Sequence, residues 1–319
     1  MYALGSAGPE VRRIQQRLTE LGCYTGPVDG DFGGGTLAAV RRFQLRQRLE
    51  ADGVVGDGTW QALFGAPAQS PAAASDSLLA RCLTLTGSFE TGKGAPDCFC
   101  GISGDFDGQG ISYGVLQWNF GQGTLQPLLQ EMLDRHPDVA EDVFGDYLEP
   151  LRQALAADKD ELMAFARSVQ DPNRHFVYEP WRGFARALGR TPEFQAVQQR
   201  HAADVYARAR QLCRTFALGS ERAVALMFDI VTQNGSIKPV TQALIQSDIR
   251  TLGGKLSGDA LEVRKMEIVA NRRAEAASPA WVDDVRRRKL CIARGGGSVH
   301  GITYDLEKQF GIGLRAAGI

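Results

Sequence analysis

The sequence predicts an α+β protein, mainly helical, in which a small three-helix domain precedes a larger helical domain with one small β lobe. Three observations support this prediction. Apolar residues recur at helical spacing along most of the 319 residues. The stretch 92–123 is rich in glycine and interrupts that spacing. Residues 66–77 are rich in Ala, Pro and Ser, which is typical of a linker. We therefore expect domains at 1–65 and 78–319, joined by a linker at 66–77.

Composition and charge exclude several classes of protein. Hydrophobic residues make up 44% of the chain and charged residues 23%, the balance of an ordinary globular protein. The 36 basic residues are matched by 37 acidic ones, so the overall positive charge of a nucleic-acid-binding protein is missing. No apolar run reaches the roughly 20 residues that cross a bilayer. We expect no nucleic-acid partner, no integral membrane segment, and synthesis in the cytoplasm without a signal peptide.

The first predicted domain contains an internal repeat. Residues 29–36 and 52–59 both follow the pattern Asp-Gly-x-x-Gly-x-x-Thr. This pattern predicts a turn with a positive φ at glycine, followed by a threonine N-cap at Thr36 and at Thr59. Apolar residues at helical spacing precede each turn, at Val11, Ile14, Leu18 and Leu21 and at Leu37, Val40 and Phe43.

These residues resemble the peptidoglycan-binding domain found beside many cell-wall enzymes. The resemblance is carried by Val11, Gln15 and Leu18, both Asp-Gly turns, Phe43-Gln44 and Thr59-Trp60. It implies peptidoglycan as the partner. It also implies peptidoglycan-binding roles for Asp29, Phe32, Asp52 and Trp60.

The second predicted domain opens with a helix. Ser77 is a candidate N-cap, and an apolar stripe from Leu78 to Phe89 stops at Glu90-Thr91-Gly92. Alternation around Ile111, Tyr113 and Val115 predicts a short β region inside the glycine-rich stretch. From residue 124 onward the apolar spacing is again mostly helical.

Two acidic residues beside the β region are candidates for glycoside hydrolysis. Glu90 ends the first helix of this domain, and Asp107 lies in a glycine-rich loop. Such hydrolysis uses one carboxylic acid to protonate the leaving oxygen and one carboxylate to act on the opposite face of the sugar. Partial burial beside Phe89 would keep Glu90 protonated, and a wet loop would keep Asp107 ionised. The alternative is that Glu90 is a surface residue and that Asp105 and Asp107 only support a turn.

This region resembles the active site of the lysozyme superfamily, most closely its chitosanase-like branch, glycoside hydrolase family 46. The resemblance is carried by Phe89-Glu90-Thr91-Gly92 and by residues 107–118, DGQGISYGVLQW. It implies a two-lobed lysozyme-like fold in which Glu90 is the general acid, Asp107 is the general base, and Ser112 helps to hold the attacking water. It also implies inversion, with the two carboxyl groups roughly 6.5–9.5 Å apart. Asp105 is the rival for the base.

Further residues are candidates for substrate binding. Sugars present apolar faces to aromatic rings and hydroxyls to amides, so we expect a cleft lined by Tyr113, Gln117, Trp118 and Asn119. Asp229, Gln233 and Asn234 lie near the end of an apolar helix and are further candidates. The alternatives are that Trp118 belongs to the core and that the last three residues cap their helix.

The remaining reactive residues are expected to be structural. The six cysteines, of which Cys98 and Cys100 are the close pair, are expected to be thiols, and the four scattered histidines suggest no metal site. The glycines at 295–297 with His300 predict a flexible turn. The basic run 286–289 predicts a solvated helix face that could meet an anionic wall. No metal or organic cofactor is expected, because this hydrolysis needs only carboxylates and water.

The two resemblances together predict a monomeric peptidoglycan hydrolase that cleaves β-1,4 glycosidic bonds as a muramidase. The linker would raise the concentration of the catalytic domain at an insoluble polymer. Three alternatives stay open: a chitosanase, a lytic transglycosylase that needs no second carboxylate, and a non-catalytic wall-binding protein. A phage endolysin that reaches the wall at lysis and an injected antibacterial effector with an immunity protein as partner both fit this prediction.

Overall fold

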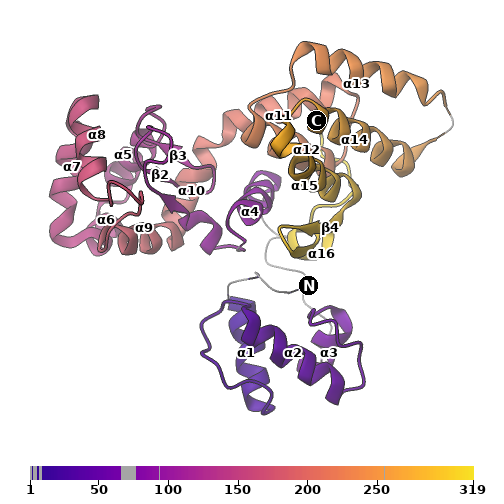
Figure 1. The fold of residues 1–319 in the computed structure, drawn as a ribbon, viewed down its shortest axis with the longest axis horizontal. Helices are drawn as coiled ribbons and strands as arrows, with labels where there is room; N and C mark the ends of the chain where they lie inside the picture. The colour runs from indigo at the N-terminus through magenta and orange to yellow at the C-terminus, as the bar shows by residue number, and fades with distance from the viewer. Residues whose placement is uncertain (1, 3–5, 7–8, 66–76, 93, 255) are drawn as a thin grey trace. The chain divides into compact units, whose positions relative to one another are not determined.

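The computed structural model of this chain describes residues 2, 6, 9–65, 77–92, 94–254 and 256–319. Within these ranges the protein is mainly helical with small antiparallel sheets, as predicted (Figure 1). The chain forms two compact units, Met1–Gly94 with Asp204–Ile319, and Ala95–Ala203. The predicted linker at 66–77 lies, apart from Ser77, outside the described residues, and the division at 1–65 and 78–319 remains a prediction.

The N-terminal segment is a three-helix arrangement with its own core. Its helices are α1 (Pro9–Glu20), α2 (Gly34–Arg46) and α3 (Asp57–Phe64). The apolar positions that the sequence singled out are almost completely buried, among them Val11, Ile14, Leu18, Val40 and Phe43. The helical spacing therefore predicted both the helices and the faces that pack together.

The internal repeat is built around two buried glutamines. The side-chain amide of Gln15 contacts the carboxylate of Asp29 at 2.8 Å and the hydroxyl of Thr36 at 3.1 Å, and its carbonyl accepts the N–H of Gly30 at 2.8 Å. Gln44 makes the same set of contacts in the second turn, with Asp52, Thr59 and Gly53. One helix thus fixes the turn that follows it, twice in succession.

The turn glycines were predicted correctly and the threonine caps were not. Gly30 and Gly53 have φ of +83° and +79°. The N-cap residues of α2 and α3 are Gly33 and Gly56. Each threonine lies inside the first helical turn, where the glutamine amide competes successfully for its hydroxyl.

The rest of the first unit is arranged around one buried helix, α12 (Glu221–Asn234). Residues 223–228 are apolar on every side, so this helix is buried all round and packs against α4 and α15. The other elements of this unit are α4 (Leu78–Thr91), α11 (Ala203–Thr215), α13 (Pro239–Thr251), α14 (Gly258–Glu275), η4 (Pro279–Trp281), α15 (Val282–Arg294), β4 (Gly296–Val299), β5 (Ile302–Asp305) and α16 (Leu306–Phe310).

Both ends of α4 follow the sequence prediction. The Ser77 hydroxyl accepts the N–H of Ala80 at 3.2 Å, and Gly92 ends the helix with a φ of +69°. The prediction of a flexible turn at 295–300 is wrong. There, β4 and β5 form an antiparallel hairpin that pairs Gly296 with Asp305 and Val299 with Ile302. Its glycines gave no alternating pattern, and its packing against α15 supplies the order that the local sequence does not.

The second unit holds the small β lobe, six α-helices and two short 3₁₀ helices among its described residues. The strands β1 (Ile102–Ser103), β2 (Ser112–Tyr113) and β3 (Trp118–Asn119) form an antiparallel sheet in that order, which confirms the predicted β region. The helical elements are η2 (Asp97–Cys100), α5 (Gln126–Arg135), α6 (Pro137–Phe144), η3 (Gly145–Tyr147), α7 (Leu148–Ala156), α8 (Lys159–Ser168), α9 (Trp181–Arg190) and α10 (Pro192–His201).

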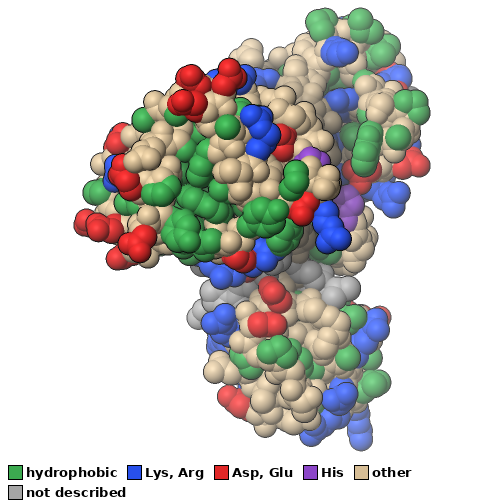
Figure 2. Space-filling view, turned by 60° about the vertical axis from the view of Figure 1, so that its left-hand side comes forward, with side chains coloured by type: hydrophobic (Ala, Val, Ile, Leu, Met, Phe, Trp, Pro, Cys, Tyr) green, Lys and Arg blue, Asp and Glu red, His purple; other side chains and the backbone are tan. Residues whose placement is uncertain are grey.

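The helices of the second unit enclose a continuous apolar core that includes residues of the β lobe. Tyr113 stacks on Phe194 with ring centroids 5.3 Å apart. Figure 2 shows hydrophobic side chains gathered on the face of this unit that is turned forward, with acidic side chains toward its edge. None of the helices in the described part of the chain is long and apolar enough to cross a membrane.

Candidate active site

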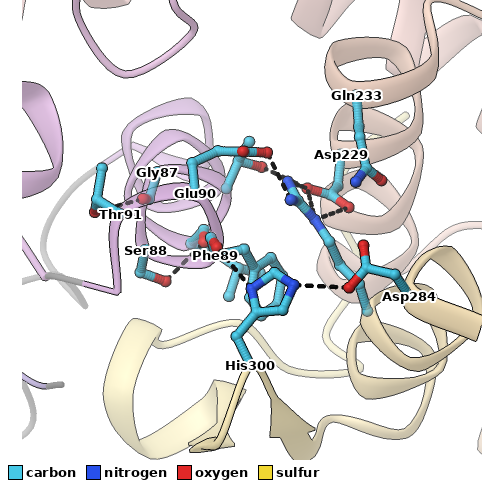
Figure 3. Close-up of polar contacts among 12 residues, drawn as sticks. Gly87, Ser88, Phe89, Glu90, Thr91, Asp229, Gln233, Asp284 and His300 are labelled. Carbon is cyan, nitrogen blue, oxygen red and sulfur yellow. Dashed lines mark hydrogen bonds and ion pairs between the residues drawn. The ribbon is translucent and has the colours of Figure 1, made fainter. Parts of the chain in front are cut away.

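The candidate acid, Glu90, lies in the last turn of α4. Phe89 beside it is buried, but 41% of the Glu90 side chain is exposed. One carboxylate oxygen accepts a hydrogen bond of 2.6 Å from the guanidinium of Arg288, which comes from α15 (Figure 3). The expectation that Glu90 is partly buried in an apolar setting is therefore wrong, because its nearest polar neighbour is a cation and water reaches the side chain.

Arg288 is held by a second acid behind Glu90. Its side chain is 1% exposed, and its Nε and second terminal nitrogen donate to Asp229 at 3.0 and 2.6 Å. Asp229 comes from the buried helix α12 and is fully enclosed. The planar guanidinium thus joins two carboxylates from different helices, a geometry that lysine cannot reproduce.

Asp229 has further partners that complete a buried network. Lys289 donates to its carboxylate at 2.5 Å and to the side-chain oxygen of Gln233 at 2.6 Å. The hydroxyl of Thr86, one turn before Glu90 on α4, donates to Asp229 at 3.2 Å. Two acids and two bases therefore share the site, and the buried charges compensate one another as buried charges must.

Burial and charge pairing act against each other in this network. Burial opposes the charged form of Asp229, but Arg288 and Lys289 outweigh it and lower the pKa of Asp229 to about 2. Burial lowers the pKa of Lys289 to about 8 in spite of the nearby Asp229. Asp229 is consequently a permanent anion at neutral pH and a fixed anchor for Arg288.

The basic run Arg286–Lys289 is predicted to form a solvated helix face, and for Arg288 and Lys289 this prediction is wrong. Both side chains are buried, so they cannot form a basic face toward an anionic wall or an immunity protein. A usable signal was present in the sequence. Val285, Arg288, Lys289 and Ile292 recur at the spacing of one helix face, which places two cations on an otherwise apolar stripe.

His300 connects the hairpin loop to the same region. One ring nitrogen lies 3.2 Å from the backbone carbonyl of Phe89, and the other lies 2.7 Å from the carboxylate of Asp284 on α15 (Figure 3). The loop predicted as a flexible turn therefore contacts the end of α4 next to Glu90.

The candidate base lies in the second unit, in the loop between β1 and β2. Asp107 is exposed, as expected, and accepts a hydrogen bond from the N–H of Gln109 at 3.1 Å. Asp105 is partly buried and accepts the N–H of Gly110 at 2.8 Å, while its own N–H donates to Gln170. Ser112 is half-buried on β2. Asp105 is thus built into the loop, and Asp107 is the carboxylate that is open to solvent.

Several predicted substrate-binding residues make hydrogen bonds inside the second unit. Tyr113 is 4% exposed and donates its hydroxyl to the carbonyl of Ala185 at 2.6 Å. Asn119 is buried and accepts the N–H of Gln122. The Gln117 side chain donates to the carbonyls of Gly101 and Gly114. These contacts hold the β lobe together, and only Trp118, which packs against the core, keeps a half-buried ring.

Of the three candidates on α12, one is buried and two are half-buried. Asp229 has no exposed surface and holds Arg288 and Lys289, so the structure places it behind the surface that a substrate would reach. Gln233 and Asn234 are half-buried and line a cavity of about 450 Å³. The end of α12 therefore presents two amides to a ligand-sized space.

Two of the four predicted peptidoglycan-binding residues are buried in the core. Phe32 is 1% exposed and Trp60 is 4% exposed, and both belong to the core of the three-helix segment. Asp29 and Asp52 are exposed, but each holds the glutamine of its turn. Of the four, Asp29 also lines a cavity of about 450 Å³ beside the start of α2.

The described cysteines and histidines form no metal centre. All six cysteines are buried thiols. In the ranges that the structure covers, no group of three His, Cys, Asp or Glu side chains is placed to hold a metal ion.

Comparison with solved structures finds chitosanases. A glycoside hydrolase family 46 chitosanase of Gynuella sunshinyii, in complex with chitotetraose, has a TM-score of 0.47 and 15% identity, covering 74% of this chain and 98% of that chain. A chitosanase of Bacillus subtilis has a TM-score of 0.44 and 18% identity, covering 72% of this chain and 95% of that chain.

Comparison of sequences finds relatives of the N-terminal segment. The spore cortex-lytic enzyme of Bacillus cereus is 47% identical over 62 residues, 19% of this chain and 24% of that protein. The N-acetylmuramoyl-L-alanine amidase CwlM of Mycobacterium tuberculosis is 44% identical over 57 residues, 18% of this chain and 14% of that protein. The chain thus spans a quarter or less of the length of these relatives. Residues 7–63 match the family described as "Putative peptidoglycan binding domain", and this segment belongs to it.

Proposed function

We propose that this protein hydrolyses β-1,4 glycosidic bonds of peptidoglycan, as a muramidase. The N-terminal domain supports peptidoglycan as the polymer. One relative that shares it is named an amidase, an enzyme of amide bonds and not of glycosidic bonds. The domain alone therefore does not specify a glycosidic bond, and the bond that is cleaved has to be inferred from the rest of the chain.

The observation that carries the proposal is the anchored carboxyl group of Glu90. One oxygen is fixed by Arg288, whose own position is set by Asp229, and the side chain remains 41% exposed to a ligand. A carboxyl group that is rigid on one side and open on the other suits proton transfer to a bound substrate. A carboxylate that merely ended a helix would need no buried guanidinium behind it.

In the proposed reaction Glu90 donates its proton to the glycosidic oxygen as the bond to the anomeric carbon breaks. Asp107 takes a proton from a water molecule whose oxygen attacks that carbon from the opposite face, and Ser112 orients this water. The reaction inverts the configuration at the anomeric carbon.

The test uses purified sacculi and the full-length protein. We expect soluble glycan release by the wild type, and a loss of about 10²–10⁴-fold in kcat for Glu90→Gln and for Asp107→Asn, with sacculus binding retained. Asp105→Asn serves as the matched control, because that carboxylate supports the loop and stays outside the proposed reaction. Loss of activity in Asp105→Asn with full activity in Asp107→Asn would move the base to Asp105.

The products distinguish the proposal from its alternatives. A muramidase leaves reducing-end N-acetylmuramic acid, which mass spectrometry after borohydride reduction identifies. Reducing-end N-acetylglucosamine would identify a glucosaminidase, and anhydro ends with an active Asp107→Asn variant would identify a lytic transglycosylase. Release from chitosan but not from sacculi would identify a chitosanase. Binding without any release, by wild type and Glu90→Gln alike, would leave a wall-binding protein.

A further inference from the structure

A cavity of about 450 Å³ lies beside the network that anchors Glu90 and is not used by the proposed reaction. The end of α12, the segment that enters α13, the last turn of α14 and the start of α15 enclose it. Its polar and aromatic lining includes Gln233, Asn234, Lys238, Arg273, Trp281 and Asp284. Its volume falls within the range of about 300–1,000 Å³ that small-molecule sites occupy.

Two buried polar atoms of this lining lack partners. In the parts of the chain that are described, neither the side-chain oxygen of Asn234 nor Nε of Arg273 has a hydrogen-bond partner. Such atoms are rare in folded proteins, because each one left unsatisfied costs about 1–3 kcal/mol. Their meeting at the wall of one cavity suggests that a polar ligand completes them.

The basic residues of the cavity are not neutralised by the protein. Arg272, next to Arg273 on α14, is paired with Asp248 at 2.6 Å. Arg273 and Lys238, by contrast, form no ion pair with any described carboxylate. Burial lowers the pKa of Arg273. Since guanidinium stays charged at neutral pH, the cavity holds a partly buried cation that lacks an anion.

The acidic residue of the cavity does not reverse this balance. The carboxylate of Asp284 already lies 2.7 Å from one ring nitrogen of His300. The other ring nitrogen of His300 contacts the backbone carbonyl of Phe89. Two cations therefore face one carboxylate that has its own partner. This arrangement would attract a carboxylate and would repel the ammonium group of a glucosamine residue.

Trp281 gives the cavity an apolar platform. It is 62% exposed although it is a large aromatic residue. Exposed aromatic rings with polar groups around them are typical of ligand sites, and the apolar face of a sugar ring stacks well on indole. The cavity thus combines a stacking surface, an amide and two cations, which are the groups needed to recognise an acidic sugar.

Two residues that line the cavity also contact residues around Glu90. Gln233 accepts a hydrogen bond from Lys289, which holds Asp229. Asp284 contacts His300 beside Phe89 (Figure 3). A sugar bound there would touch Gln233, which contacts the network that anchors Glu90.

We propose that this cavity is a subsite for a carboxylate-bearing sugar of the glycan, with Trp281 under the sugar ring and with Arg273 and Lys238 paired to the carboxylate. This inference rests on the proposed function and names its substrate class. In peptidoglycan the carboxylate can be the lactyl group of N-acetylmuramic acid or a carboxylate of the peptide attached to it, and both carry the same chemistry.

The first experiment measures binding, so it does not depend on turnover. Full-length Glu90→Gln is titrated with N-acetylmuramic acid, N-acetylglucosamine and N-acetylmuramyl dipeptide, and tryptophan fluorescence is recorded. We expect N-acetylmuramic acid to bind at least about tenfold more tightly than N-acetylglucosamine, with a signal that Trp281→Phe abolishes. Tighter binding of the dipeptide would assign the carboxylate to the peptide, and weaker binding would assign it to the lactyl group.

The variants test the cations directly. Lys238→Gln and Arg273→Gln should each weaken binding of the acidic sugar about tenfold, and Arg273→Lys should retain most of it. Arg250→Gln is the matched control, because Arg250 is an exposed arginine on α13 away from the cavity lining. Thermal unfolding of each variant verifies the fold. Equal affinity for the two monosaccharides, or unchanged affinity in both cavity variants, would refute the subsite.

Turnover separates this inference from the proposed function. In an active enzyme, Lys238→Gln should raise KM on sacculi and leave hydrolysis of uncharged chitin oligosaccharides unchanged. Equal losses on both substrates would contradict recognition of a carboxylate. If the wild type cleaves neither substrate, the proposed function fails, and the binding experiment still decides whether the cavity takes an acidic sugar.

Discussion

Replacing Asp229 with asparagine should destabilise the unit built around α12 by about 2–5 kcal/mol. The lower figure follows from the pKa of Asp229, which its basic neighbours bring from 3.8 to about 2 against the effect of burial. That difference corresponds to about 2 kcal/mol for neutralising the carboxylate. The upper figure is the cost of leaving one partner of a buried ion pair uncompensated. After substitution, Arg288 and Lys289 would share Glu90 as the nearest acid of the network.

The matched control is Asp248→Asn. Asp248 and Arg272 form an ion pair with the same short distance of 2.6 Å, but about a third of each side chain is exposed. Exposed pairs contribute about 0–1 kcal/mol, so this variant should unfold almost as the wild type does. The two substitutions remove the same charge from the same kind of pair, and they differ in burial.

The assay is urea unfolding of the full-length proteins, followed by circular dichroism and by tryptophan fluorescence. Asp229→Asn should move the midpoint to lower urea by an amount equivalent to about 2–5 kcal/mol, and Asp248→Asn should move it by less than about 1 kcal/mol. Equal shifts in the two variants, or a shift below about 1 kcal/mol for Asp229→Asn, would show that burial does not set the strength of this network.

Three further predictions concern pH, the internal repeat and the thiols. Because the pKa of Asp229 is lower in the folded protein than in the unfolded chain, its stabilising contribution is complete above about pH 4 and is lost as pH falls through 2. The difference in unfolding free energy between wild type and Asp229→Asn should shrink over that range, and a constant difference would contradict the assignment. Gln15→Ala should lower the stability of the three-helix segment by about 3 kcal/mol, because the N–H of Gly30 and the turn around it lose their shared partner; Gln16→Ala, on the exposed face of α1, should change it by less than about 0.5 kcal/mol in the same thermal scan. The six buried thiols should react with a disulfide reagent only after urea unfolding, since burial raises the pKa of Cys213 and Cys291 to about 12, and rapid labelling of the native protein would show that at least one is accessible.

Local patterns determined a large part of this protein. The helical spacing predicted the three N-terminal helices and their buried faces, because amphipathic helices must turn their apolar side toward a core. The turn glycines, the Ser77 cap and the end of α4 at Gly92 were predictable, because each is a backbone requirement met by residues a few positions apart. The β lobe was also visible in the sequence, as a break in helical spacing.

Contacts between distant residues were decided by the tertiary structure alone. Arg288 lies 198 positions from Glu90 and 59 from Asp229, and no local rule joins three side chains over such separations. A basic run is expected to face solvent, but Arg288 and Lys289 are buried, because α15 packs against α12 and turns these two side chains inward. The sequence carried half of this signal, a lone acid in the apolar run of α12 and two cations on the apolar face of α15. Folding pairs them, because a buried charge without a partner is too costly to keep.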